Sequence, residues 1–465
     1  MNLAARVAWV DRLPAGLWLI LPVVALTPVW LWSAARLLDR SDDPLGVVAL
    51  AALAALVARD RDRFSRRPRA GWLVVTTLLA AAAILGGGAL PPLARGVLAV
   101  LAVCATMMAV RVPAQPMLAL TGLALLALPL LSSLQFFVGY PLRVITAEAS
   151  RLLLAAHGVD VMREGSTLAI AGTVVMVDAP CSGIQMGWVA YFTACAAAAW
   201  LRLPDGRFLR RVPLVGVTVL AGNILRNTVL VVSEAGLVRW PDWTHEAIGV
   251  AAFAVVCLLV LWQVSAAARA PVVTWEVRLL NHPVRPVSAG TWARLFAFVM
   301  LTGLTFWPWL APQPVIAAAA PPAIEWPREL DGRPLRPLAL SAVEQRFADR
   351  FPGAIARFTD GEGAIVLRHV TAPTRMLHPA VDCYRGLGYR VGSDTLERAG
   401  DRRSGVPPTL WRCLVAEKNG RRLRVCERIV DAHGRGFTDT SAWYWAAVTG
   451  RSHGPWRAVT TARML

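Results

Sequence analysis

Three side chains with complementary chemistry occur at three consecutive hydrophobic segments of the chain. Cys181 comes directly before the first segment, Arg226 lies within the second, and His245 opens the third. A thiolate attacks carbonyl carbon, an imidazole transfers protons near neutral pH, and a guanidinium stabilises developing negative charge. If the fold brings them together, the three groups suit acyl transfer from a peptide bond.

The sequence around Cys181 favours a reactive thiol. Residues 178–183 are Asp-Ala-Pro-Cys-Ser-Gly, at the point where a polar stretch meets a hydrophobic one. We expect a helix to begin at Cys181, after Pro180 has fixed the direction of the chain. The unpaired N–H groups and the dipole at a helix N-terminus both favour the thiolate.

The elements that must position these residues are membrane helices. The chain has 465 residues, of which 56% are hydrophobic, and many apolar stretches in its first two-thirds approach the length that crosses a bilayer. The predicted fold is mainly α, a polytopic membrane helix bundle of about eight to nine spans. The expected segments are 15–37, 44–58, 72–90, 96–110, 117–139, 182–201, 213–234, 245–264 and 291–311.

Arginines between these segments orient the bundle, because Lys and Arg near short loops stay on the cytoplasmic side. The connections after the second and the sixth segment both carry arginine clusters, and both predict the same topology. The N-terminus is expected in the cytoplasm, and the loop 140–180 and the tail after 311 are expected outside. We therefore predict a multi-pass protein of the inner (cell) membrane with a periplasmic C-terminal domain.

Polar residues recur along the segment that contains Arg226. The stripe consists of Asn223, Arg226, Asn227, Ser233 and Glu234. Their spacing places them on neighbouring faces of one helix, and an arginine inside a bilayer is costly unless it is paired or faces inward. We expect Asn223 and Asn227, together with Ser182 and Gly183, to bind substrate or to support the catalytic residues.

The outer loop 140–180 is expected to have structure of its own. We predict a helix from Ala147 to His157, followed by a short extracytoplasmic β-hairpin or meander, because residues 167–177 are rich in β-branched side chains and are interrupted by Gly172. The last strand would lead the chain to Cys181 at the membrane face.

The motifs on the three segments, taken in order, resemble those of the exosortase/archaeosortase family. The resemblance covers roughly residues 15 to 265. The motifs are Cys181-Ser182-Gly183, Asn223-Ile224-Leu225-Arg226 and His245-Glu246-Ala247-Ile248-Gly249. The family often continues with Leu-Arg-Ser after Cys-Ser-Gly, whereas this chain continues with Ile184-Gln185-Met186-Gly187.

The resemblance implies a membrane-embedded cysteine peptidase or transpeptidase. Cys181 would be the nucleophile, Arg226 would stabilise the transition state or orient the substrate, and His245 would transfer protons. The implied substrates are exported proteins that end in a Pro-Glu-Pro-like motif, a transmembrane helix and a basic tail. Cleavage would take place at the outer face of the membrane through a thioester on Cys181.

The sequence predicts three parts of the chain. Residues 1–311 form the transmembrane domain, with its catalytic helices in 181–265, and residues 312–322 form a linker rich in Pro and Ala. Residues 323–465 are predicted to form an extracytoplasmic α+β domain, because they are more polar and contain short alternating runs.

One stretch of the C-terminal domain carries a second candidate site. Residues 377–389 resemble the His…Cys…Gly signature of an exopolysaccharide-associated domain that accompanies some exosortases. His378 and Cys383 could form a second reactive pair, but a structural or substrate-docking role is preferred because the sequence offers no third partner.

A hairpin in the same domain predicts a disulfide, and this prediction does not use the family resemblance. Asn419-Gly420 is a strong type I′ turn signal, and pairing outward from it sets Cys413 against Cys426. Directly opposite residues at such a position have Cα atoms about 4.5 Å apart, which a disulfide tolerates. The predicted outside location favours the oxidised bond.

Two other functions fit parts of the pattern. A transporter or a polysaccharide-export component would use Arg226 and the polar stripe as a substrate path and would tolerate substitution of Cys181. A membrane acyl- or glycosyltransferase would need acidic pairs at the membrane face, and Asp178, Glu234 and Asp242 are candidates. The peptidase is preferred because it uses Cys, Arg and His together.

No cofactor, metal or nucleic-acid partner is predicted. No Cys or His pair has the spacing of metal ligands. The formal charge of +18 partly reflects the orienting arginines, and no zinc-finger spacing or basic-aromatic repeat indicates binding of nucleic acid. Besides its protein substrates, the expected partner is membrane lipid.

Overall fold

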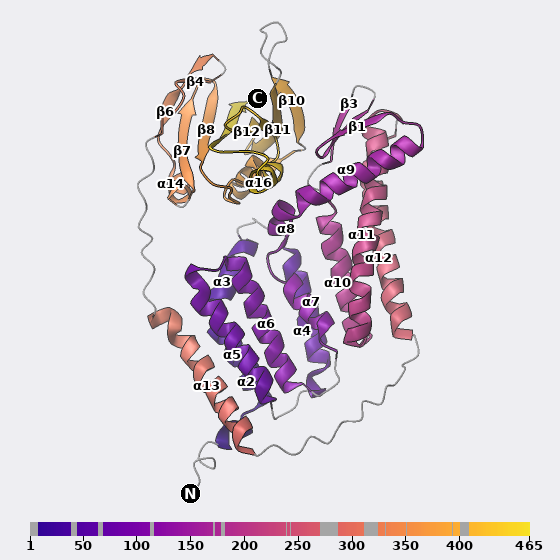
Figure 1. The fold of residues 1–465 in the computed structure, drawn as a ribbon, viewed down its shortest axis with the longest axis vertical. Helices are drawn as coiled ribbons and strands as arrows, with labels where there is room; N and C mark the ends of the chain where they lie inside the picture. The colour runs from indigo at the N-terminus through magenta and orange to yellow at the C-terminus, as the bar shows by residue number, and fades with distance from the viewer. Residues whose placement is uncertain are drawn as a thin grey trace. The chain divides into compact units, whose positions relative to one another are not determined.

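The structure, a computed structural model, describes most of the chain as two compact units (Figure 1). The units are Met1–Gln135 with Pro141–Pro314, and Phe136–Tyr140 with Val315–Leu465. The described residues are 8–38, 44–63, 68–111, 116–170, 173–177, 182–238, 240–241, 243–269, 287–310, 324–330, 332–349, 351–392, 394–399 and 409–465.

The first unit is helical, and one group of its helices packs around a core of small and aliphatic side chains. These helices are α2 (Ala15–Ala25), α3 (Thr27–Leu38), α5 (Ala70–Leu85), α6 (Pro92–Val110) and α13 (Val287–Leu310). Leu26, Ala80, Ala99 and Leu301 are fully buried where they meet. The 3₁₀ turns of this unit are η1 (Ala8–Arg12), η2 (Arg61–Arg63) and η3 (Gly86–Gly88).

A second group of helices contains the segments that carry the motif residues. Its members are α4 (Leu45–Arg59), α7 (Leu118–Leu126), α8 (Leu131–Phe137), α10 (Ile184–Trp200), α11 (Asp205–Glu234) and α12 (Trp243–Arg269). Ala190, Ala194 and Ala198 on α10 are fully buried, so this helix approaches its neighbours closely. A Cβ at Gly222 of α11 would lie 2.4 Å from Val256 Cγ2 of α12, so a glycine is needed where these two helices touch.

The described residues contain fewer helices that could span a membrane than the predicted eight to nine spans. Within the described residues, α6, α11 and α12 are long and apolar enough to cross a membrane, and two bent helix pairs raise the number to five if each pair is one span. The pairs are α2 with α3, bent by 66°, and α7 with α8, bent by 86°. All nine predicted segments are helical, but the count of eight to nine spans is not confirmed, because hydropathy does not register bends or shortened helices such as α4 and α5.

The loop after α8 forms a helix and a small sheet, as predicted, but the helix begins at Gly139 instead of Ala147. The helix is α9 (Gly139–Ala156), and the strands β1 (Val161–Glu164), β2 (Thr167–Ile170) and β3 (Thr173–Met176) form an antiparallel meander. Leu154, Leu168 and Val175 are buried together with Val231 of α11, so the meander packs on the helix that carries Arg226. Gly172 lies outside the described residues.

An ion cluster ties the meander to α9. Glu148 of α9 accepts hydrogen bonds of 2.7 Å from Arg151 and 2.6 Å from Arg163 of β1. These bonds lower the pKa of Glu148 to about 2, so its carboxylate remains charged over the physiological range.

In its described residues, the C-terminal unit is a nine-stranded antiparallel sheet with three short helices, which is an α+β arrangement. The main strand order is β10-β11-β12-β14-β8-β7-β6, with β13 beside β12 and β9 beside β11, and β4 with β5 forms a separate ribbon. The strands are β4 (Glu329–Leu330), β5 (Arg333–Pro334), β6 (Arg336–Leu338), β7 (Gly353–Thr359), β8 (Gly363–Val370), β9 (Arg390–Val391), β10 (Thr395–Ala399), β11 (Thr409–Lys418), β12 (Arg421–Val430), β13 (Gly436–Phe437) and β14 (Trp456–Met464). The helices are α14 (Ala342–Ala348), α15 (Ala380–Gly386) and α16 (Thr440–Val448).

The hairpin of β11 and β12 has the predicted register. Asn419 and Gly420 have φ angles of 51° and 75°, as a type I′ turn requires. Cys413 stands opposite Cys426, and the two sulfurs are joined, with the Cα atoms 4.0 Å apart. The bond therefore links the pair that the turn predicts.

Candidate functional site

Two of the three candidate catalytic residues lie in the described part of the chain. Arg226 is half-buried in α11, and His245 is exposed in the first turn of α12. Cys181 lies outside the described residues, which resume at Ser182. The surroundings of Ser182 and Gly183 therefore show where the nucleophile motif enters the bundle.

Helix α10 begins at Ile184, three residues later than predicted. The reason is Gly183, whose φ of 78° is incompatible with a right-handed helix. Ser182 is buried, its hydroxyl donates to Gln135 Oε1 at 2.9 Å, and it accepts from the N–H of Ile184 at 3.3 Å. The motif thus ends in a fixed turn, and Cys181 precedes the helix instead of opening it.

Gly183 lies directly against Asn223 of α11. A Cβ at Gly183 would lie 2.9 Å from Asn223 Cγ and 3.1 Å from its Nδ2. Asn223 is nearly one helical turn before Arg226. The end of the Cys-Ser-Gly motif therefore touches the start of the Asn-Ile-Leu-Arg motif.

The asparagines of the polar stripe hold α9 against α11. Asn223 Nδ2 donates to Thr146 Oγ1 at 3.3 Å, and Asn227 Nδ2 donates to Ser150 Oγ at 3.0 Å. Both asparagines are almost completely buried. Of the two predicted roles, substrate contact or support, these bonds favour support.

The guanidinium of Arg226 lies against α12. A Cβ at Gly249 would lie 3.7 Å from Arg226 Nε and 3.8 Å from its Nη2, and Gly249 is about one turn after His245. The Nε group of Arg226 is buried and has no hydrogen-bond acceptor among the described residues. A buried donor without an acceptor is unusual in a native fold.

His245 has an acidic neighbour that the sequence did not assign to it. Its Nδ1 lies 3.8 Å from Oε1 of Glu234, the last residue of α11, and both side chains are about half exposed. This is an ion-pair distance and longer than a hydrogen bond. A carboxylate beside Nδ1 can orient the imidazole ring and leaves Nε2 for proton transfer.

The chemistry that this arrangement permits follows from two groups, the Nε donor of Arg226 and the Nε2 nitrogen of His245. Arg226 offers a buried N–H donor, and His245 offers a ring nitrogen that can move a proton. Arg226 lies near Gly249 of α12, and His245 is about one turn before Gly249 on the same helix. Such a pair can stabilise an oxyanion and protonate a leaving group.

In the C-terminal unit, the structure brings His378 and Cys383 together. His378 Nε2 lies 2.9 Å from Cys383 Sγ, and Nδ1 lies 2.8 Å from the carbonyl oxygen of Met376. The sequence showed no third partner because that partner is a backbone carbonyl.

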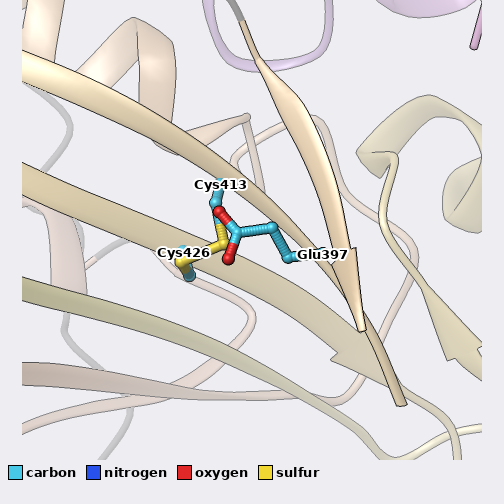
Figure 2. A group of neighbouring side chains, drawn as sticks. All are labelled: Glu397, Cys413 and Cys426. Atoms are coloured by element: carbon cyan, nitrogen blue, oxygen red, sulfur yellow. A yellow bond between two sulfur atoms is a disulfide. The ribbon is translucent and has the colours of Figure 1, made fainter. Parts of the chain in front are cut away.

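One group of side chains in the described residues has the proximity of a metal site. Figure 2 shows the Glu397 carboxylate beside the sulfurs of Cys413 and Cys426, with the ligand atoms within 4.8 Å of one another. The sulfurs are bonded to each other, so neither is the thiolate that binds metals. Asp178 and Asp242, the acids proposed for a transferase, lie outside the described residues.

Comparison with known proteins gives one match, which covers the helical unit. A family model described as transmembrane exosortase matches residues 13–262. No curated protein and no solved structure matches the chain. The matched region contains Cys181, the Arg226 contacts and His245, and its apolar helices make this a multi-pass membrane protein. The chain belongs to the transmembrane exosortase family.

Proposed function

We propose that this protein is a cysteine peptidase or transpeptidase that cleaves the C-terminal sorting signal of exported proteins. The observation that carries the proposal is the pair of contacts made by Gly183 with Asn223 and by Gly249 with Arg226. These contacts join the three family motifs in space, so that residues from three helices can act on one substrate bond.

The proposed reaction begins with attack of the Cys181 sulfur on the scissile carbonyl. His245 takes the thiol proton and gives it to the leaving amine, while the free Nε donor of Arg226 stabilises the oxyanion. The C–N bond breaks, the anchor leaves as an amine, and a thioester remains on Cys181. Water or a second amine then releases the product, and Glu234 stabilises the charged imidazole in both steps.

The proposed location is the outer face of the inner membrane. Arginines gather at the start of α11, at Arg207, Arg210 and Arg211, whereas Glu234 is its last residue. Arg226 lies eight residues before that end, or about 12 Å along the helix. Since arginines favour the cytoplasmic side, the catalytic groups would face outward, with the N-terminus inside and the C-terminal unit in the periplasm.

The proposed substrates carry a Pro-Glu-Pro-like motif, a transmembrane helix and a basic tail. Such a helix would lie beside the bundle and present its outer end to Cys181. The alternative of a transporter has less support, because Asn223 and Asn227 bond to α9 and do not line a path.

The test is co-expression of the protein with a reporter that carries such a signal, followed by the intact mass of the reporter. Cys257→Ala is the matched control, since Cys257 is another free thiol of the helical unit. We expect a shortened reporter with the wild type and with Cys257→Ala, and a full-length reporter with Cys181→Ala. Shortening by an inserted Cys181→Ala protein would refute the mechanism, and an uncut reporter in every case would refute this substrate class.

A further inference from the structure

The C-terminal unit contains a nucleophile and a base in direct contact. The Met376 carbonyl lies 2.8 Å from His378 Nδ1, and because a carbonyl only accepts hydrogen bonds, Nδ1 must carry the ring proton. The lone pair of Nε2 then faces the Cys383 sulfur at 2.9 Å. A thiol, an imidazole and a third group that fixes the imidazole have the arrangement of an activated nucleophile.

The imidazole is held on every side by packed groups. Leu377, directly before His378, and Ala380, two residues after it, are each 2% exposed. The ring meets Phe347 of α14 edge to face, with centroids 5.5 Å apart. The N–H of Ala380 donates to Glu427 Oε2 of β12 at 2.8 Å, which anchors the start of α15 and hence Cys383.

The electrostatic surroundings keep the pair neutral. Burial raises the pKa of the Cys383 thiol, and burial together with the charge of Arg368 lowers the pKa of His378. Burial also raises the pKa of Glu427 to about 7. At neutral pH the imidazole is therefore an unprotonated base beside a protonated thiol, which is the starting state for general-base activation.

Cys383 has no competing thiol in its own unit. Cys383 is half-buried, and the other two cysteines of the unit are bonded to each other. His378, Arg368 and Glu427 line one recess together with apolar residues that include Ile429 and Phe437. This recess places apolar side chains and the guanidinium of Arg368 beside the imidazole of His378.

We propose that His378 and Cys383 form a second acyl-transfer site, which accepts an acyl group from an ester or a thioester. The S–H proton passes to His378 Nε2 as the S–C bond forms, and Arg368, which Thr460 holds by a 3.0 Å hydrogen bond, stabilises the oxyanion. The leaving alcohol or thiol takes the proton from Nε2 as its bond to the carbonyl breaks. Water then hydrolyses the thioester, so the cycle needs no other reactant. The proposal does not depend on the reaction at Cys181.

The test uses the full chain in detergent with Cys181→Ala, so that the other proposed nucleophile is absent. The probe is p-nitrophenyl acetate, the readouts are released nitrophenolate and the acetylated peptide, and the peptide map separates Cys383 from the other cysteines. We expect acetyl on Cys383 and a burst of about one nitrophenolate per chain. A map without acetyl on Cys383, when iodoacetamide labels the same thiol, would overturn the proposal.

The role of the imidazole is tested by His378→Gln, with His433→Gln at an exposed loop as the matched control. General-base assistance contributes about 10² to 10⁴, so acylation should slow by about that factor only in His378→Gln. Equal acylation rates of Cys383 in both variants would overturn the proposal.

If His378→Gln fails to fold, the role of the imidazole is tested by the pH dependence of acylation in the protein that retains both His378 and Cys383. The charged groups around the imidazole are Arg368 on β8, Asp382 on α15 and Glu427 on β12. With the pKa of His378 below its ordinary value of about 6.5, acylation should be level from pH 7 to 8 and fall on acidification. A rate that rises about tenfold per pH unit up to pH 8 would indicate a simple thiolate and would also overturn the proposal.

Discussion

Replacing Gly183 by alanine tests whether the turn before α10 positions the active site. Gly183 has a φ of 78°, and a residue with a side chain costs about 1–2 kcal/mol in that conformation. The new methyl group would lie 2.9 Å from Asn223 Cγ, so the asparagine must move, and such overpacking costs about 1–3 kcal/mol. Together the two effects amount to about 2–5 kcal/mol.

Gly158→Ala is the matched control for the backbone effect alone. Gly158 has a φ of 81°, and a Cβ there would meet no described atom within 4 Å. The difference between the two variants is therefore the contact with Asn223, about 1–3 kcal/mol. If this strain displaces the turn that follows Cys181, it corresponds to about 5- to 150-fold less reporter cleavage, since about 1.4 kcal/mol is a factor of ten.

The assay measures the cleaved fraction of the reporter over time, together with the thermal midpoint of each purified variant. Adding Asn223→Ala to Gly183→Ala should relieve part of the strain, because it removes the two closest atoms and leaves Asn223 Cβ, 3.3 Å from the new methyl group. A double-mutant cycle isolates this coupling. Equal cleavage by Gly183→Ala and Gly158→Ala would show that the Asn223 contact does not position the site.

Three further changes address the catalytic pair and the C-terminal unit. Arg226→Lys should slow cleavage by about 100-fold, as loss of an oxyanion donor does, because an ammonium cannot present the forked donors of arginine; near-normal cleavage by the inserted variant would contradict this role. Glu234→Gln should slow cleavage at saturating reporter by about fivefold, because an exposed ion pair with His245 contributes at most about 1 kcal/mol; an unchanged rate would exclude the pairing. Replacing Cys413 and Cys426 by alanine opens a loop with a sequence separation of 13 and should lower the free energy of unfolding of the C-terminal unit by about 3 kcal/mol in denaturant titrations; a loss below about 1 kcal/mol would contradict the estimate.

The sequence predicted best where one local signal determines the geometry. Asn419 and Gly420 both tolerate positive φ, so the turn type, the register of β11 and β12 and the position of Cys413 opposite Cys426 follow from two residues. The meander after α9 was predicted for the same reason, from short β-branched runs between turn residues. In both cases the interacting residues are close in sequence.

Predictions failed where geometry depends on distant contacts. The start of α10 was placed at Cys181 because Pro180 and the hydrophobic run suggest it, but Gly183 adopts a left-handed conformation against Asn223. The span count is not confirmed, because bends such as that between α7 and α8 depend on packing and not on hydropathy. The polar stripe was recognised, but its partners Thr146 and Ser150 on α9 carry no sequence signal.

In both candidate sites, the reactive side chains are positioned by glycines or by a backbone carbonyl. A search of the sequence for reactive side chains overlooks such groups. Gly222 allows α11 to approach Val256 of α12, and about one turn further on the guanidinium of Arg226 lies against Gly249. A side chain at Gly222 would clash with Val256 and would separate α11 from the helix that carries His245. In the C-terminal unit, the group that fixes the imidazole of His378 is the carbonyl of Met376, which any residue type could supply. Residue types therefore identify the groups that can react, but glycine contacts and backbone carbonyls determine whether those groups meet, and these emerge only from the folded chain.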